Sequence, residues 1–302
     1  MPEYRAVRKA HSLLEICKTP ALAAEVTIAY HPIKLDVQGF APLELVGAWV
    51  VDAADPRFGG ISSLACDGDA LLVLTDSGAL IRFPRPGSGT TRGAIRELPA
   101  GPGSPLLKED RDSEALARDP AGRGWWVSFE NHNELWLYDD DFTRALTHVD
   151  VRDPLFYHNF GVEALASTSV GLVILPESGQ SASILSNNQT RRLPFANAYG
   201  TLSEAATLPD GSILLLARRV GRRDILKHGG IDNRLLRLVA QDGRLETRLL
   251  AGLRLGPLHN VEAMAAEPAA NGRTRLWLMT DNDFAGWRST LLLELELEPP
   301  SR

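Results

Sequence analysis

Short apolar runs, each bounded by Gly, Asp or Pro, recur along most of the chain. The clearest are residues 71–75, 125–129, 171–176, 212–217 and 276–280. They are rich in Leu, Val, Ile and Trp, so they predict buried β-strands. No comparable 3.6-residue pattern appears, which favours an all-β chain over a helical solenoid.

A short motif precedes each of these runs and places an oxygen-bearing side chain at the same point. The shared positions are Ser62, Glu114, Glu163, Glu204 and Glu262. They recur at intervals of 52, 49, 41 and 58 residues, the differences between these numbers. Such spacing is typical of the four-stranded blade of a β-propeller. We therefore predict an all-β propeller.

Third and outer strands are expected after each run, except that the last repeat lacks a fourth strand. Residues 43–51 are predicted to supply it, which would close the ring by pairing an N-terminal strand with the C-terminal blade and protect open edges. Five blades are preferred, and a degenerate sixth from residues 25–35 is the alternative. The predicted domain organisation is an N-terminal extension, 1–42, and a single propeller domain, 43–302.

A second position repeats where the second strand of each blade ends. It is occupied by Asp76, Glu130, Glu177, Arg218 and Asp281. Because the first strands of a propeller line its channel, the first set should form a ring at the axis, with the second set nearer the channel mouth.

The first ring is an oxygen-only set rich in carboxylates, which would repel one another without a cation. Such a set suits a hard divalent ion, Ca²⁺ before Mg²⁺, because several bulky protein ligands fit looser coordination. The predicted metal ligands are Ser62, Glu114, Glu163, Glu204 and Glu262. The alternative is that these side chains bind backbone N–H groups of neighbouring blades and act as structural latches.

Several segments also resemble a known family, the phytase-like domain described by the esterase-like activity of phytase. The matching stretches are GGISSL at 59–64, DSEALA at 112–117, WWVSFE at 125–130, NFGVEALA at 159–166, ARR at 217–219, HNVEAMA at 259–265 and MTDNDF at 279–284. Members of that family are mostly exported bacterial propellers, so the resemblance implies a propeller that hydrolyses phosphate esters such as phytate. The order of ring residues is also similar to the calcium site of five-bladed calcium-dependent apyrases, with Glu204 in place of a serine.

The resemblance implies a calcium-dependent hydrolase of phosphate esters, whose substrate is a small anionic molecule. In that hypothesis the catalytic residues are Glu130, Arg218 and Asp281: Glu130 or Asp281 orients water, and Arg218 or its neighbour Arg219 holds phosphate oxygens. The predicted substrate-binding residues are Asp76, Glu177, Arg219 and Asn282. The alternative for Arg218 is a structural role, in which it neutralises the glutamate ring. Two alternatives stay open for the whole chain: a non-catalytic binding propeller with a structural cation, and a lactonase or sugar-acid esterase.

Composition narrows this picture in a few respects. A net charge of −6 and a pI near 5.7 disfavour nucleic acid as a partner. No apolar run is long enough for a membrane span. Residues 1–24 only faintly resemble a signal peptide, since His11, Glu15 and Lys18 interrupt the apolar segment. The family resemblance suggests a periplasmic or secreted protein and the weak signal leaves a cytoplasmic one open, while the oligomeric state is not predicted.

Overall fold

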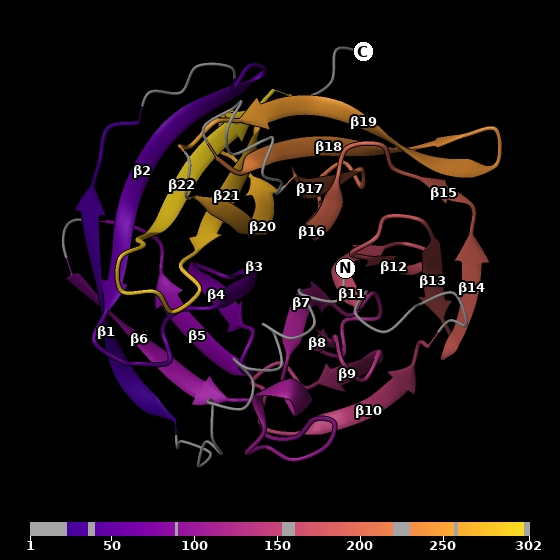
Figure 1. The fold of residues 1–302 in the computed structure, drawn as a ribbon, viewed down its shortest axis with the longest axis horizontal. Helices are drawn as coiled ribbons and strands as arrows, with labels where there is room; N and C mark the ends of the chain where they lie inside the picture. Colours follow the sequence, from indigo (N-terminus) through magenta and orange to yellow (C-terminus); the bar gives the residue numbers. More distant parts are fainter. Residues whose placement is uncertain are drawn as a thin grey trace.

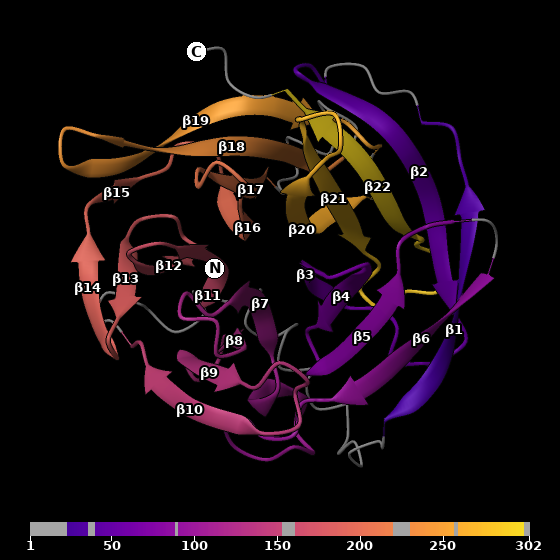
Figure 2. The same cartoon turned by 180° about the vertical axis from the view of Figure 1, so that it is seen from behind.

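The computed structural model describes residues 23–35, 40–87, 90–152, 161–219, 230–256 and 259–298. Figures 1 and 2 show curled sheets arranged around a central axis, with β3, β7, β11, β16 and β20 innermost. This arrangement confirms the predicted all-β propeller. No helix among the described residues is long and apolar enough to cross a membrane.

Three sheets each contain one four-stranded antiparallel group. The first is β7 (Ser113–Arg118), β8 (Trp125–Phe129), β9 (Glu134–Tyr138) and β10 (Ala145–Asp150). The second is β11 (Val162–Thr168), β12 (Gly171–Pro176), β13 (Ala182–Ser186) and β14 (Gln189–Leu193). The third is β16 (Thr201–Thr207), β17 (Ile213–Arg219), β18 (Asp232–Gln241) and β19 (Arg244–Leu253), with β15 (Phe195–Ala196) added in parallel to β19.

The fourth sheet has nine strands and contains the closure of the ring. One half is β3 (Ile61–Asp67), β4 (Ala70–Thr75), β5 (Ala79–Pro84) and β6 (Thr90–Glu97). The other half is β20 (Asn260–Pro268), β21 (Thr274–Asp281), β22 (Thr290–Leu297) and β2 (Leu43–Ala53). Strand β2 pairs antiparallel with β22, so the predicted closure by an N-terminal strand is confirmed. Strand β1 (Ala24–Pro32) then pairs with both β2 and β6 and joins the two halves.

The described strands thus form five four-stranded groups, which we call the first to fifth blades, beginning with β3–β6. Residues 25–35, considered for a sixth blade, contribute the single strand β1. Because residues 1–22 lie outside the described part of the chain, the total number of blades stays a prediction.

The apolar runs become strands that are buried on both faces. All residues of β4, β8 and β12 are buried, because each second strand lies between two neighbouring blades. Five hydrophobic clusters fill these spaces, and each contains side chains from two adjacent blades. Burial from both sides explains why these strands are continuously apolar rather than alternating.

Candidate functional site

Each innermost strand carries a β-bulge close to its first residue. The pairing register shifts between Ile61 and Ser63, Ser113 and Leu116, Val162 and Ala164, Leu202 and Glu204, and Val261 and Ala263. The bulged residues are Ser62, Glu114 with Ala115, Glu163, Ser203 and Glu262. A bulge re-aims the extra side chain and bends its strand, so the repeat seen in the sequence corresponds to a repeated backbone distortion.

In the fourth blade this register differs from the sequence alignment by one residue. The bulged residue is Ser203, whereas the alignment placed Glu204 at this position. Glu204 instead has no exposed surface and accepts hydrogen bonds from Ser63 Oγ and from its neighbour Ala205 N, the latter at 2.9 Å. The backbone N–H groups of Leu64 and Met264 also bind it. Glu204 therefore has the structural contacts that the latch alternative described.

The start of each innermost strand is tied to a neighbouring blade. Ile61 N donates to Asp281 Oδ1 at 2.8 Å, and Leu202 N donates to Glu177 O at 2.9 Å. Ser113 Oγ donates to Thr75 O at 2.7 Å. These contacts fix the residue just before each bulge and thereby fix the direction of the bulged side chain.

Five carboxylates from the second and third blades meet at this end of the channel. Ligand oxygens of Asp112, Glu114 and Glu130 lie within 4.8 Å of one another, and so do those of Glu130, Glu163 and Glu177. We call these five residues the acidic cluster. Glu130 belongs to both triplets and is its central member.

Burial and mutual repulsion raise the pKa of two carboxyls in this cluster. The pKa of Glu114 is raised well above its usual value by burial and by Glu163, Asp112 and Glu130. The pKa of Glu163, which is 6% exposed, is raised by burial and then by Glu130 and Glu177, while Arg218 opposes the shift. Both carboxyls would ionise more readily beside a cation.

Two cationic side chains flank the acidic cluster. Lys108, in the 3₁₀ turn η1 (Lys108–Asp110), has its Nζ 3.2 Å from Asp112 Oδ1 and 3.1 Å from Asp76 Oδ2. On the other side, Arg218 ion-pairs with Glu262 and lies 3.8 Å from Glu177 Oε1. Arg218 thus offsets the charge of Glu262, one member of the predicted glutamate ring.

The remaining predicted ring residues lie outside the acidic cluster. Ser62 is buried, and its hydroxyl donates to Leu74 O of its own blade at 3.3 Å. Glu262 accepts from Asn260 Nδ2 in addition to pairing with Arg218. The structure therefore brings Glu114 and Glu163 together and gives Ser62, Glu204 and Glu262 other partners.

The predicted catalytic and substrate-binding residues are also distributed unevenly. Burial and the proximity of Asp283 raise the pKa of Asp281 to about 8, while Asp281 accepts from Ile61 N and Asp283 N. Asn282 Oδ1 accepts from Phe284 N at 3.0 Å and caps the turn after β21. Arg219 is exposed at the end of β17.

Glu130 packs against the backbone of Gly161, at the start of the third blade. A Cβ added at Gly161 would lie 2.1 Å from Glu130 Cγ and 2.6 Å from Glu130 Cα. Only a residue without a Cβ lets the two backbones approach this closely. The glycine of the NFGVEALA stretch therefore has a specific role, which is to admit Glu130 to the centre of the cluster.

Asp112 and Lys108 have site contacts that the repeat did not reveal. Asp112 lies two residues before the ring position Glu114 in the DSEALA stretch. The other repeats have no acidic residue at the equivalent position, so the repeat alignment did not single it out. Lys108 lies in the connection between β6 and β7, and only the fold brings it to Asp76 and Asp112.

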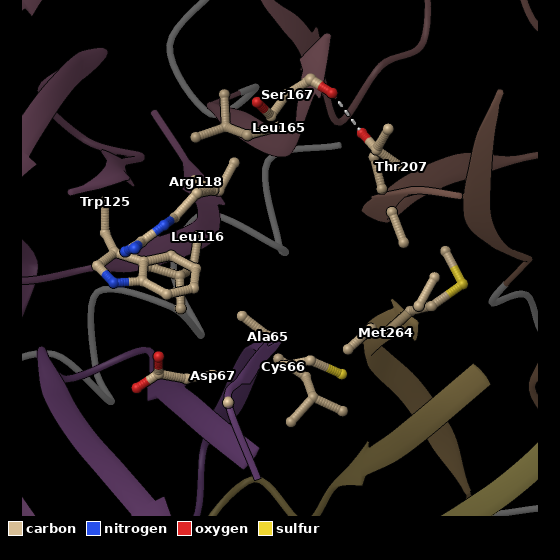
Figure 3. Close-up of a pocket in the computed structure, with 17 residues that line it drawn as sticks. Ala65, Cys66, Asp67, Leu116, Arg118, Trp125, Leu165, Ser167, Thr207 and Met264 are labelled. Atoms are coloured by element: carbon tan, nitrogen blue, oxygen red, sulfur yellow. Dashed lines mark hydrogen bonds between the residues drawn. The ribbon is translucent and has the colours of Figure 1, made fainter. Parts of the chain in front are cut away.

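A separate cavity of about 320 Å³ lies at the other ends of the innermost strands (Figure 3). Its lining includes Leu64, Leu116 and Met264, and Arg118 lies over the ring of Trp125, 4.6 Å from its centroid. Leu64 and Met264 are two of the residues whose N–H groups bind Glu204. The Glu204 network therefore stands between this cavity and the acidic cluster along the strands.

Comparison with known proteins places this geometry in a family. The phytase-like family, described by the esterase-like activity of phytase, matches residues 56–284. A protein named uroporphyrinogen decarboxylase from Sorangium cellulosum is 51% identical over 55 residues, but the match spans only 16% of this chain and 15% of that protein. So short a match carries no argument about function.

Among solved structures, glutaminyl cyclase from Myxococcus xanthus has a TM-score of 0.52 and 11% identity, covering 85% of this chain and 97% of that one. Virginiamycin B lyase from Staphylococcus aureus has a TM-score of 0.43 and 9% identity, with coverage of 87% and 99%. At 11% identity the match to glutaminyl cyclase shows the fold alone. Because the family match spans most of the propeller and includes the whole acidic cluster, the chain belongs to the phytase-like family, described by the esterase-like activity of phytase.

Proposed function

We propose that this protein is a hydrolase of phosphate esters that depends on a divalent cation, with Ca²⁺ the best fit. The observation that carries the proposal is the acidic cluster, in which Glu130 shares two carboxylate triplets within 4.8 Å. The family described by the esterase-like activity of phytase supports a hydrolase, and the fold supports a propeller. The cation and the phosphate ester are inferred from the chemistry of the side chains.

The acidic cluster fits a hard divalent cation on two grounds. Its donors are all carboxylate oxygens, which Ca²⁺ prefers. Burial and like charges also hold the pKa values of Glu114 and Glu163 high, so a cation would relieve a repulsion that the fold builds in. With Ser203 rather than Glu204 at the bulge, the bulged residues read Ser, Glu, Glu, Ser, Glu, an order similar to the apyrase arrangement, and the second and third of them belong to the acidic cluster.

When bound, such a cation would neutralise phosphate oxygens and favour attack by water. The chain's own residues supply the rest. Arg218 and Lys108 flank the cluster as cations, and the Arg218 guanidinium can hold two phosphate oxygens at once. Glu130 accepts a hydrogen bond from water and orients it. Burial and Asp283 raise the pKa of Asp281 to about 8, so Asp281 can carry a proton near neutral pH and is our candidate proton donor.

The decisive experiment compares two identical substitutions of buried glutamates, Glu163→Gln and Glu204→Gln. Calcium titration by calorimetry is combined with turnover of a panel of phosphate esters and lactones, with and without chelator. We expect Glu163→Gln to lose calcium binding and phosphate-ester turnover, and Glu204→Gln to keep both. Unchanged phosphate-ester turnover in chelator and in Glu163→Gln would refute the proposal. Turnover of lactones alone, or calcium binding without turnover, would replace it with one of the two alternatives.

A further inference from the structure

Ser128 is the second-last residue of β8 and lies opposite the β-bulge that carries Glu114. Its side chain has no exposed surface. The pairing between β7 and β8 passes from Ser113↔Phe129 to Leu116↔Val127, so Glu114 and Ala115 together oppose the single residue Ser128. Ser128 therefore occupies the point at which the second blade distorts to present Glu114.

The Ser128 hydroxyl makes two hydrogen bonds that connect two blades. It accepts from Ala115 N at 2.9 Å, within the bulge of its own blade. It donates to Val162 O at 2.8 Å, in the third blade. Ala115 directly follows Glu114, and Val162 directly precedes Glu163. One buried hydroxyl thus binds the backbone next to both carboxylates.

These bonds satisfy a backbone group that the bulge leaves without a partner in the strand ladder. A bulge withdraws a backbone N–H from the strand ladder, and a buried N–H without a partner is costly. Ser128 satisfies Ala115 N, and Ser63 Oγ satisfies the next one by accepting from Leu116 N at 3.0 Å. The two serines fix the bulge from both sides, but only Ser128 also reaches the strand that carries Glu163.

We propose that Ser128 is a positioning residue of the acidic cluster, which sets the relative placement of Glu114 and Glu163 through its bridge from Ala115 N to Val162 O. Its effect on cation affinity rests on the proposed function. Its effect on the two carboxylates does not.

The test uses Ser128→Ala, which removes the bridge, and Ser128→Thr, which keeps a hydroxyl at the same place. Thr207→Val is the matched control, because Thr207 Oγ1 also bridges two blades, donating to Ser167 O at 2.7 Å, but at the cavity end of the strands. Each full-length variant is crystallised without added metal and titrated with CaCl₂ well below its melting temperature.

We expect Ser128→Ala to displace the Glu114 and Glu163 carboxylates and to raise the calcium Kd by about tenfold to hundredfold, the usual effect of losing a group that orients metal ligands. Ser128→Thr should restore the wild-type calcium Kd. Thr207→Val should lower the melting temperature but leave the calcium Kd unchanged. A lower melting temperature in Ser128→Ala with unmoved carboxylates would overturn the inference, even if Ser128→Thr does not fold. If the wild-type protein binds no calcium, the proposed function fails, while the crystal structures still decide the positioning role.

Discussion

Gly161→Ala provides a sharp test of how the acidic cluster is assembled. The added methyl carbon would lie 2.1 Å from Glu130 Cγ, 2.7 Å from Cβ and 2.6 Å from Cα. Non-bonded carbons prefer a separation of about 3.5–4.0 Å. Because Cα is a backbone atom, turning the Glu130 side chain cannot relieve the overlap. The two segments must therefore separate by about 1 Å, judged against that contact distance.

Two losses follow from that separation. Overpacking of this kind costs about 1–3 kcal/mol in the free energy of unfolding. A displaced Glu130 also weakens both triplets at once, so the calcium Kd should rise by about tenfold or more. Urea denaturation and calcium titration by calorimetry measure the two effects on the same preparation.

Gly252→Ala is the control for the loss of a glycine. Gly252 lies in β19, and a Cβ there would meet no atom within 4 Å. Alanine at this position should be neutral or add about 0.5–1 kcal/mol of stability, because glycine weakens a strand interior. If Gly161→Ala matched the wild type in both denaturation midpoint and calcium Kd, the packing of Glu130 on Gly161 would not be the device that places it.

Three further outcomes are expected. The pKa of Asp281 is raised to about 8 in the fold, so its contribution to stability is complete below its ordinary pKa of 3.8 and is lost as the pH rises through about 8. Urea titrations across this pH range should show that the free energy of unfolding declines less steeply in Asp281→Asn than in the wild type, and an unchanged slope would contradict the assignment. Glu204→Ala should lower the free energy of unfolding by about 2 kcal/mol or more, because the buried donors that bind Glu204 lose their acceptor. Glu204→Gln keeps an acceptor and should cost less, so equal losses in the two variants would argue against a structural role for Glu204. Calcium at a hundred times its Kd should stabilise the protein by about 2.7 kcal/mol. At a fixed calcium concentration the stabilisation should be larger at pH 8 than at pH 5, because Glu114 and Glu163 must lose protons to bind the ion; a stabilisation independent of pH would place the ion elsewhere.

The sequence by itself determined the propeller and the closing strand, and it indicated carboxylates for the candidate site. Each blade repeats the same problem, a second strand buried between two neighbours, so the same apolar run recurs and can be recognised without knowledge of the fold. The closure by residues 43–51 followed because a last blade with three strands leaves an open edge.

The one-residue register was decided only by the tertiary structure. The string Ser-Glu-Ala at 203–205 matches Ser-Glu-Ala at 113–115, yet Ser113 pairs normally and Ser203 is bulged. A slip of one residue sends a strand side chain to the opposite face, so Glu204 leaves the bulge position and binds Ser63 instead. No local pattern distinguishes these two serines.

The composition of the acidic cluster was likewise decided by packing between blades. The sequence predicted a ring of metal ligands at the axis and a second ring nearer the channel mouth, which held both catalytic and substrate-binding residues. The fold instead gathers Glu114 and Glu163 with Glu130 and Glu177, adds Asp112, and places cations on either side. Periodicity reports which positions are equivalent within each blade, but carboxylates meet across the seams between blades. Those distances depend on contacts such as Gly161 on Glu130 and Ser128 on Val162, which exist only once the ring is assembled.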